Sequence, residues 1–258
     1  MSLILLLALQ AAGPPDPSVE RYAACVRQVG ENAAAAERSA EAWRTAGGGA
    51  FARQCLGLAL SAQSRFPAAA AAFEEAARAA EAARDQRAAT LWAQAGNAWL
   101  ASGDAAKARG ALDAALAAGT LAGLERGEAL LDRARALTAA NQTAAARIDL
   151  DAALILAPAD PLAWLLSATL ARRGGDLPRA KRDIAEALRR SADDASVQLE
   201  AGNIAAAGGD EAGARSAWSE AARLAPDRDA GRAAVAALRQ FDAPTTPVPP
   251  PPMLVEGR

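Results

Sequence analysis

Side chains suited to catalysis or metal binding are scarce in this chain. No histidine occurs among its 258 residues, which removes the commonest general base and the commonest metal ligand together. Two acidic pairs, Asp149 with Asp151 and Asp193 with Asp194, lack the spacing of a calcium loop and are expected on solvated helix surface and turns. The glycine run 47–49 is not followed by the Lys-Ser/Thr of a phosphate-binding loop. The sequence therefore predicts a protein that is not an enzyme and that holds no cofactor and no metal.

The overall composition favours helices. Apolar residues make up 52% of the chain and aromatic ones only 4%, so a core must be built mainly from Ala and Leu, which suits closely packed helices. The formal net charge is −2, with 28 Lys and Arg interspersed among 30 Asp and Glu. A nucleic-acid partner would require a basic face. We therefore predict an all-α protein with no nucleic-acid partner.

A pattern of about 34 residues recurs five times between residues 50 and 228. Its clearest copy, residues 195–228, is typical of two short helices joined by a Gly-Asp turn, with a small residue at the eighth place and a large one at the twenty-fourth. A small residue lets two helices approach closely, and a large one fills the space beside the crossing. The eighth places hold Gly57, Gly96, Ala134, Ala168 and Gly202, and the twenty-fourth places hold Phe73, Leu112, Leu150, Ile184 and Trp218.

This length and this alternation of small and large residues resemble the tetratricopeptide repeat (TPR) family, whose unit is a helix-turn-helix hairpin. The resemblance covers residues 50–241 and implies an α-solenoid of stacked hairpins. The first two units are four or five residues longer than the later ones. The extra length is expected in a longer second helix over residues 73–87 and in the loop 119–123.

The resemblance also implies a binding surface, because in the family the first helix of each hairpin lines a concave groove. The residues carried over to that groove are Gln54, Asn97, Arg135, Thr169, Arg172 and Asn203. The family's clamp for a peptide carboxylate also uses lysine, which these positions lack, so binding of chaperone C-termini is not implied. A groove of this composition is expected to accept an extended segment or a helix.

Cys25 and Cys55 are the only cysteines and lie 30 positions apart, close to one repeat. Residues one repeat apart occupy equivalent helices of adjacent hairpins, so a disulfide is expected where the Cα atoms come within about 7 Å. Two buried free thiols are the alternative. Thiol-based catalysis is not indicated, because the pair is not CxxC and has no histidine partner.

The segments outside the repeats have their own signals. Residues 1–13 match the apolar region of a signal peptide and are too short to cross a bilayer, which takes about 20 residues; an uncleaved anchor or a packed N-terminal helix are the alternatives. Residues 14–49 are expected to form an irregular helical hairpin and residues 229–241 a capping helix. The Pro-rich residues 242–258 are expected to be a disordered tail, with a polyproline ligand as the alternative.

These features together predict an exported bacterial TPR protein, periplasmic or secreted after signal-peptide cleavage. Its expected function is a non-catalytic scaffold of the cell envelope that binds a protein or peptide partner in the concave groove. A structural subunit of a larger envelope assembly and a cytoplasmic TPR adaptor are the alternatives. The mature chain is expected to have no membrane span.

Overall fold

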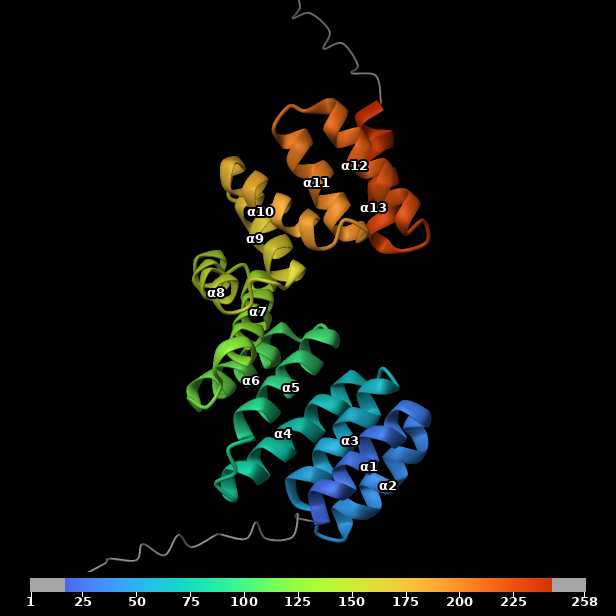
Figure 1. Cartoon of the computed structure of the whole chain (residues 1–258), viewed down its shortest axis with the longest axis vertical. Helices are drawn as coiled ribbons and strands as arrows, with labels where there is room; N and C mark the ends of the chain where they lie inside the picture. The colour runs from blue at the N-terminus through green and yellow to red at the C-terminus, as the bar shows by residue number, and fades with distance from the viewer. Residues whose placement is uncertain (1–16, 243–258) are drawn as a thin grey trace, which may run out of the picture. The chain divides into compact units, whose positions relative to one another are not determined.

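The computed structural model describes residues 17–242, and within that range it contains thirteen α-helices and no strand (Figure 1). The helices are α1 (Pro17–Glu31), α2 (Ala33–Thr45), α3 (Gly49–Ala62), α4 (Phe66–Ala82), α5 (Ala88–Ala101), α6 (Ala105–Ala117), α7 (Gly123–Ala139), α8 (Thr143–Leu156), α9 (Pro161–Arg173), α10 (Leu177–Arg190), α11 (Ala195–Ala207), α12 (Glu211–Leu224) and α13 (Asp229–Asp242). The prediction of an all-α helical-repeat fold is confirmed. The expected signal peptide and the Pro-rich tail lie outside the described residues.

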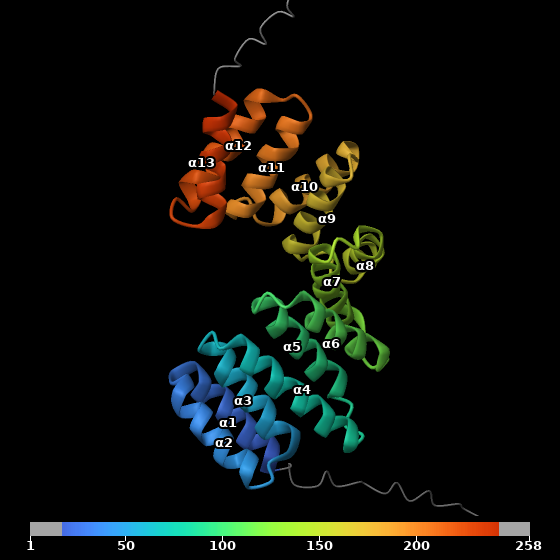
Figure 2. The ribbon, with the colours of Figure 1, turned by 180° about the vertical axis from the view of Figure 1, so that it is seen from behind.

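The helices form two compact units that divide at Pro158. In the first unit, consecutive helices pair into four hairpins from α1–α2 to α7–α8, and Figure 2 shows the same pairs from behind. In the second unit, α9 pairs with α10 and α11 with α12, and α13 packs on both α11 and α12. The repeat register does not reveal this division, because the interval from Ala134 to Ala168 is the regular 34 residues.

The Gly-Asp turns have a simple backbone explanation. Gly103, Gly175 and Gly209 have φ values of 82°, 81° and 75°, which a residue without a Cβ adopts at little cost. The next residue caps the following helix: Asp104, Asp176 and Asp210 each accept a hydrogen bond from the backbone N–H three residues later. The glycine therefore ends one helix, and the aspartate begins the other.

The small eighth place and the large twenty-fourth place are in contact in the three hairpins whose eighth place is glycine. A Cβ atom on Gly57 would lie 2.6 Å from the ring of Phe73, one on Gly96 would lie 2.5 Å from Leu112, and one on Gly202 would lie 2.4 Å from Trp218. In the other two copies the eighth and twenty-fourth places are also buried: Ala134 and Leu150 in the third copy, Ala168 and Ile184 in the fourth. The glycines therefore make room for the large side chain of the second helix.

The extra residues of the first two repeats lie in longer helices and in one loop. Helix α4 has 17 residues, whereas α10 has 14. Helix α7 also has 17 residues, whereas α9 has 13, and α7 follows the loop 118–122. Helix α4 ends at Ala82, five residues before the expected end of the long second helix at Arg87.

Candidate functional site

The first helices of successive hairpins are joined by single links between their side chains. A disulfide joins Cys25 of α1 to Cys55 of α3, with 6.1 Å between the Cα atoms. Nε2 of Gln54 on α3 donates to Oε1 of Gln94 on α5 at 3.1 Å. We call the surface formed by α1, α3, α5 and α7 the first-helix face of the first unit. The disulfide expected from the spacing is present in the structure.

A carboxylate brings two of the predicted groove residues together on α5 and α7. Nδ2 of Asn97 donates to Oδ2 of Asp132 at 3.0 Å, and Nη1 of Arg135 donates to Oδ1 of the same carboxylate at 2.8 Å. Asn97 is exposed, and the side chain of Asp132 is 17% exposed. Because a carboxylate only accepts, Asp132 fixes the amide orientation of Asn97 and leaves its Oδ1 available as an acceptor.

In the second unit, Glu200 on α11 is the corresponding centre. It accepts from Nε of Arg172 on α9 at 2.7 Å and from Nδ2 of Asn203 at 3.2 Å. Oδ1 of Asn203 in turn accepts from the indole N–H of Trp218 at 3.1 Å. Both ends of the Asn203 amide are therefore occupied within the fold. Asn203 thus serves packing in this structure, in contrast to Asn97.

The two remaining predicted groove residues also have partners inside the protein. Gln54 is only 8% exposed, so it belongs to the interior between α3 and α5. The hydroxyl of Thr169 donates to the carbonyl oxygen of Leu165 on its own helix at 2.9 Å. These contacts leave Asn97, Asp132 and Arg135 as the polar cluster that the first-helix face presents to solvent.

The residues at the centre of these contacts are not among the predicted groove residues. Gln94, Asp132 and Glu200 all occupy the sixth place of their repeats, two positions before the small residue. The recurrence of polar residues at the sixth place was the sequence signal that could have identified them. The resemblance gave no reason to include them, because the family's groove positions do not contain the sixth place.

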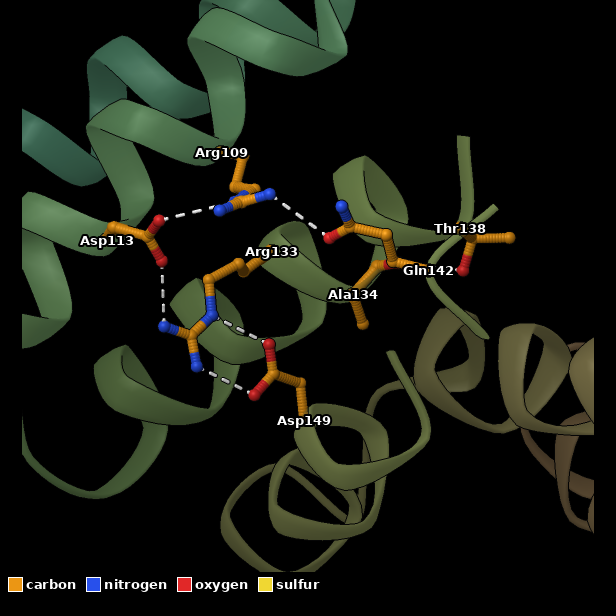
Figure 3. A network of polar contacts seen from close by, with 7 residues as sticks. All are labelled: Arg109, Asp113, Arg133, Ala134, Thr138, Gln142 and Asp149. Carbon is orange, nitrogen blue, oxygen red and sulfur yellow. Dashed lines mark hydrogen bonds and ion pairs between the residues drawn. The ribbon is translucent and has the colours of Figure 1, made fainter. Parts of the chain in front are cut away.

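A second polar network connects α6, α7 and α8 (Figure 3). Nε of Arg133 on α7 donates to Asp149 on α8 at 2.7 Å, and its Nη1 donates to Asp113 on α6 at 3.0 Å. The hydrogen bond to Asp149 raises the pKa of the Arg133 guanidinium above its ordinary value, so this group stays charged. Arg109 extends the network by donating to Asp113 and to Gln142 at the start of α8.

The Arg133 network corrects the expectation that Asp149 is a solvated carboxylate. Only 5% of its side chain is exposed, because Arg133 at the seventh place reaches it across the hairpin. The next repeat places Ser167 and Asp183 at the same two positions, and the serine hydroxyl donates to that buried aspartate. The repeat pattern did not anticipate these pairs, since the other copies hold Leu or Ala at the seventh place.

Glu74 on α4 forms a hydrogen bond that links α4 to α5. Its Oε1 accepts from the indole N–H of Trp99 on α5 at 2.7 Å, while Oε2 accepts from Arg78. Arg78 lies over the ring of Trp92, 5.4 Å from its centroid. Substitution of these two residues would therefore disturb the contact between α4 and α5.

Two kinds of feature are absent from the described residues. Within residues 17–242, no cluster of three or more Cys, Asp or Glu side chains could hold a metal ion. No helix in the same range is both long enough and apolar enough to cross a membrane.

Comparison with known proteins identifies the fold. No protein-family model matches the sequence, and no curated protein sequence matches it. The solved structure of PilW, a widely conserved type IV pilus biogenesis factor, superposes with a TM-score of 0.71 at 18% identity, over 86% of this chain and 100% of PilW. Pseudomonas aeruginosa PilF gives 0.69 at 17%, over 86% and 100%. YrrB, a TPR protein with an unusual peptide-binding site, gives 0.56 at 21%, over 77% and 96%.

These similarities define the class of protein. The hairpins, the capped Gly-Asp turns and the contacts between small and large residues are those of a TPR fold. At identities of 17% to 21%, the likeness establishes the fold of this chain.

Proposed function

We propose that this chain is a non-catalytic protein-interaction scaffold of a bacterial cell envelope, and that the first-helix face of its first unit binds an extended peptide or a helix. The observation that carries the proposal is the cluster of the exposed Asn97 with the half-buried Asp132 and Arg135. It offers a fixed amide acceptor, a carboxylate and a guanidinium on two neighbouring helices. Such groups can pair with the backbone and the charged side chains of a peptide.

The envelope location rests on three further observations. The apolar residues 1–13 match a signal peptide in sequence. The disulfide between Cys25 and Cys55 favours an oxidising compartment, because such bonds rarely persist in the cytosol. One of the structures with this fold, PilW, is described as a type IV pilus biogenesis factor. Together these three observations support export over a cytoplasmic adaptor.

The test is a crosslinking pull-down from envelope extracts with matched variants. We expect Asn97→Ala with Arg135→Ala to weaken partner capture by on the order of 1 to 3 kcal/mol, because both groups lose their contacts with the bound segment. The matched control is Glu41→Ala with Arg44→Ala, which removes an ion pair confined to the second helix α2. Glu74 and Arg78 are unsuitable as a control because Glu74 binds Trp99.

The outcomes separate the proposal from its rival. Loss of partner in the groove variant, at unchanged thermal stability, supports binding on the first-helix face. Equal recovery by both variants would instead favour a structural subunit that uses other surfaces. Protein purified from the native cell should begin near residues 12–14 if the chain is exported, and mass spectrometry decides this.

A further inference from the structure

Helix α8 exposes two isoleucines on its outer side. Ile148 is 71% exposed and Ile155 is 79% exposed, which exceeds every other large hydrophobic residue of the described chain. They are seven positions apart and therefore lie on one side of the helix. The opposite side of α8 carries the buried residues Ala146, Leu150 and Ala153, which face α7.

The other repeats show that these two isoleucines are exceptional. Ile148 and Ile155 occupy the twenty-second and twenty-ninth places of the third repeat, a position pair that is exposed in every copy. The equivalent pairs are Ala71 and Arg78, Gly110 and Ala117, Arg182 and Arg189, and Ser216 and Arg223. Four copies thus keep this stripe small or charged, as a solvated surface requires. The third copy alone has large apolar side chains at both places.

The apolar surface continues beyond the isoleucines. Ala145 is exposed and Ala152 is half-buried, and both lie on the same side of α8 as Ile148 and Ile155. We call these four residues the α8 ridge. Leu124, at the start of α7, is 58% exposed, and that end of α7 lies against the end of α8, since a Cβ on Gly127 would approach Leu156 to 2.9 Å. An exposed apolar surface of this kind marks an interaction site.

We propose that the α8 ridge binds the α8 ridge of a second copy of this chain, with the two helices antiparallel about a twofold axis near residue 150. A twofold interface requires that each contact occurs twice with the roles exchanged. About that axis Ile148 meets the partner's Ala152, and Ile155 meets the partner's Ala145. Each large side chain thus faces a small one, which is the complementarity that closely packed helices need.

The charges beside the ridge fit the same arrangement. Arg147 and Asp151 form an ion pair within α8 at 3.0 Å and lie on one flank of the ridge. This internal pairing leaves no unpaired charge on that flank of either copy. The ridge is therefore complementary to itself in shape. An unrelated partner would impose no such symmetry.

The size of the ridge sets the expected strength of the dimer. One helix against another buries less than the roughly 1,200 to 2,000 Å² of a standard interface, so a dissociation constant in the micromolar range is expected. Helix α8 contributes nothing to the first-helix face. The proposal of dimerisation can therefore be tested independently of the proposed peptide binding.

The test is the molar mass of the purified protein by sedimentation equilibrium across nanomolar to high micromolar concentrations. Wild-type protein should shift from monomer to dimer. Ile148→Arg with Ile155→Arg should remain monomeric, with dissociation constants raised at least about tenfold. These residues copy Arg182 and Arg189, which the fourth repeat carries at the same places, so the fold should persist. The control, Ala71→Arg with Ala117→Arg, adds the same charge at equivalent sites of other repeats and should still dimerise.

A second experiment tests the register itself. A mixture of an Ile148→Cys protein and an Ala152→Cys protein should form a disulfide between the two chains, since facing residues bring their Cβ atoms within bonding reach. Monomer at every concentration would overturn the proposal. So would a dimer that survives the double arginine substitution, or crosslinking no faster than between Ala71→Cys and Ala117→Cys proteins.

Discussion

Gly202 of α11 and Trp218 of α12 are in direct contact across their hairpin, because a Cβ on the glycine would lie 2.4 Å from Cδ1 of the indole. We expect Gly202→Leu to unfold or fray the second unit, at a cost of roughly 1 to 3 kcal/mol or more, since the ring has no space to move away. Helices α1–α8 should keep their protection, because repeat stability is shared mainly between neighbours. Native-state hydrogen exchange measures both effects. Uniform loss of protection from Cys25 to Phe241, or no change, would contradict this local coupling.

Gly110 in α6, unlike Gly202, has open space beside it. It lies within the helix, and a Cβ at this position would meet no atom within 4 Å. Gly110→Ala should therefore stabilise the protein by about 0.5 to 1 kcal/mol, because alanine restricts the unfolded chain and favours the helix. Urea denaturation reports the difference. A destabilised Gly110→Ala variant would mean that α6 packs against something not seen in this structure.

Arg133→Ala should destabilise the first unit by on the order of 2 to 4 kcal/mol, because it leaves the buried carboxylate of Asp149 without its main partner. The double variant Arg133→Ala with Asp149→Ala should cost less than Arg133→Ala alone. It reproduces the Ala95–Ala111 and Ala201–Ala217 pairs found at the same places in two other repeats. A double-mutant cycle by chemical denaturation measures the coupling. Strictly additive losses would show that the pair is not coupled.

Glu37 provides a prediction for pH dependence. Hydrogen bonds from Nε2 of Gln63 and from Arg65 hold the pKa of this carboxyl below its ordinary value. A carboxyl with a depressed folded-state pKa stabilises the fold above its unfolded pKa, and that contribution disappears as the pH falls through the folded value. Gln63→Ala should raise the pKa of Glu37 toward its ordinary value, as followed by NMR titration. Gln86→Ala, the control, should leave the Glu37 titration unchanged, and an unchanged titration in Gln63→Ala would refute the assignment.

Removal of the disulfide should act on the N-terminal hairpin first. The bond between Cys25 and Cys55 closes a loop with a sequence separation of 30, worth roughly 3 to 4 kcal/mol in the chain-entropy model. Cys25→Ala with Cys55→Ala should therefore lower the free energy of unfolding and expose the amides of α1 and α2 earlier than those of α7. Non-reducing peptide mapping of the native protein checks the bond itself. Two alkylatable thiols would also remove one argument for export.

Much of the fold follows from the sequence because its signals are local and repeated. The eighth and twenty-fourth places carry an alternation of size that only a close helix crossing explains, and the contact between Gly57 and Phe73 is the result. The Gly-Asp turns combine a left-handed backbone residue with a helix cap in two consecutive positions. The division at Pro158 left no such signal, because it depends on how hairpins pack over long range.

The candidate site was harder to predict, because hydrogen-bond partners depend on geometry between helices. Asn97 and Asn203 both occupy the ninth place, yet only Asn203 comes within reach of a tryptophan N–H. That difference arises from Trp218, where the second repeat has Leu112 at the corresponding twenty-fourth place. The residue type at the twenty-fourth place therefore decides whether the amide fifteen positions earlier is satisfied or remains available.

The covalent link between α1 and α3 also determines how this chain would respond to mechanical tension. If the protein were pulled from its two ends, force would pass directly from Cys25 to Cys55, and the intervening residues 26–54 would carry no load. A segment of this length spans about 100 Å when fully extended, so the oxidised chain would be shorter by that amount at full extension. Reduction of one bond would release this hidden length. The released residues belong to α1, α2 and α3.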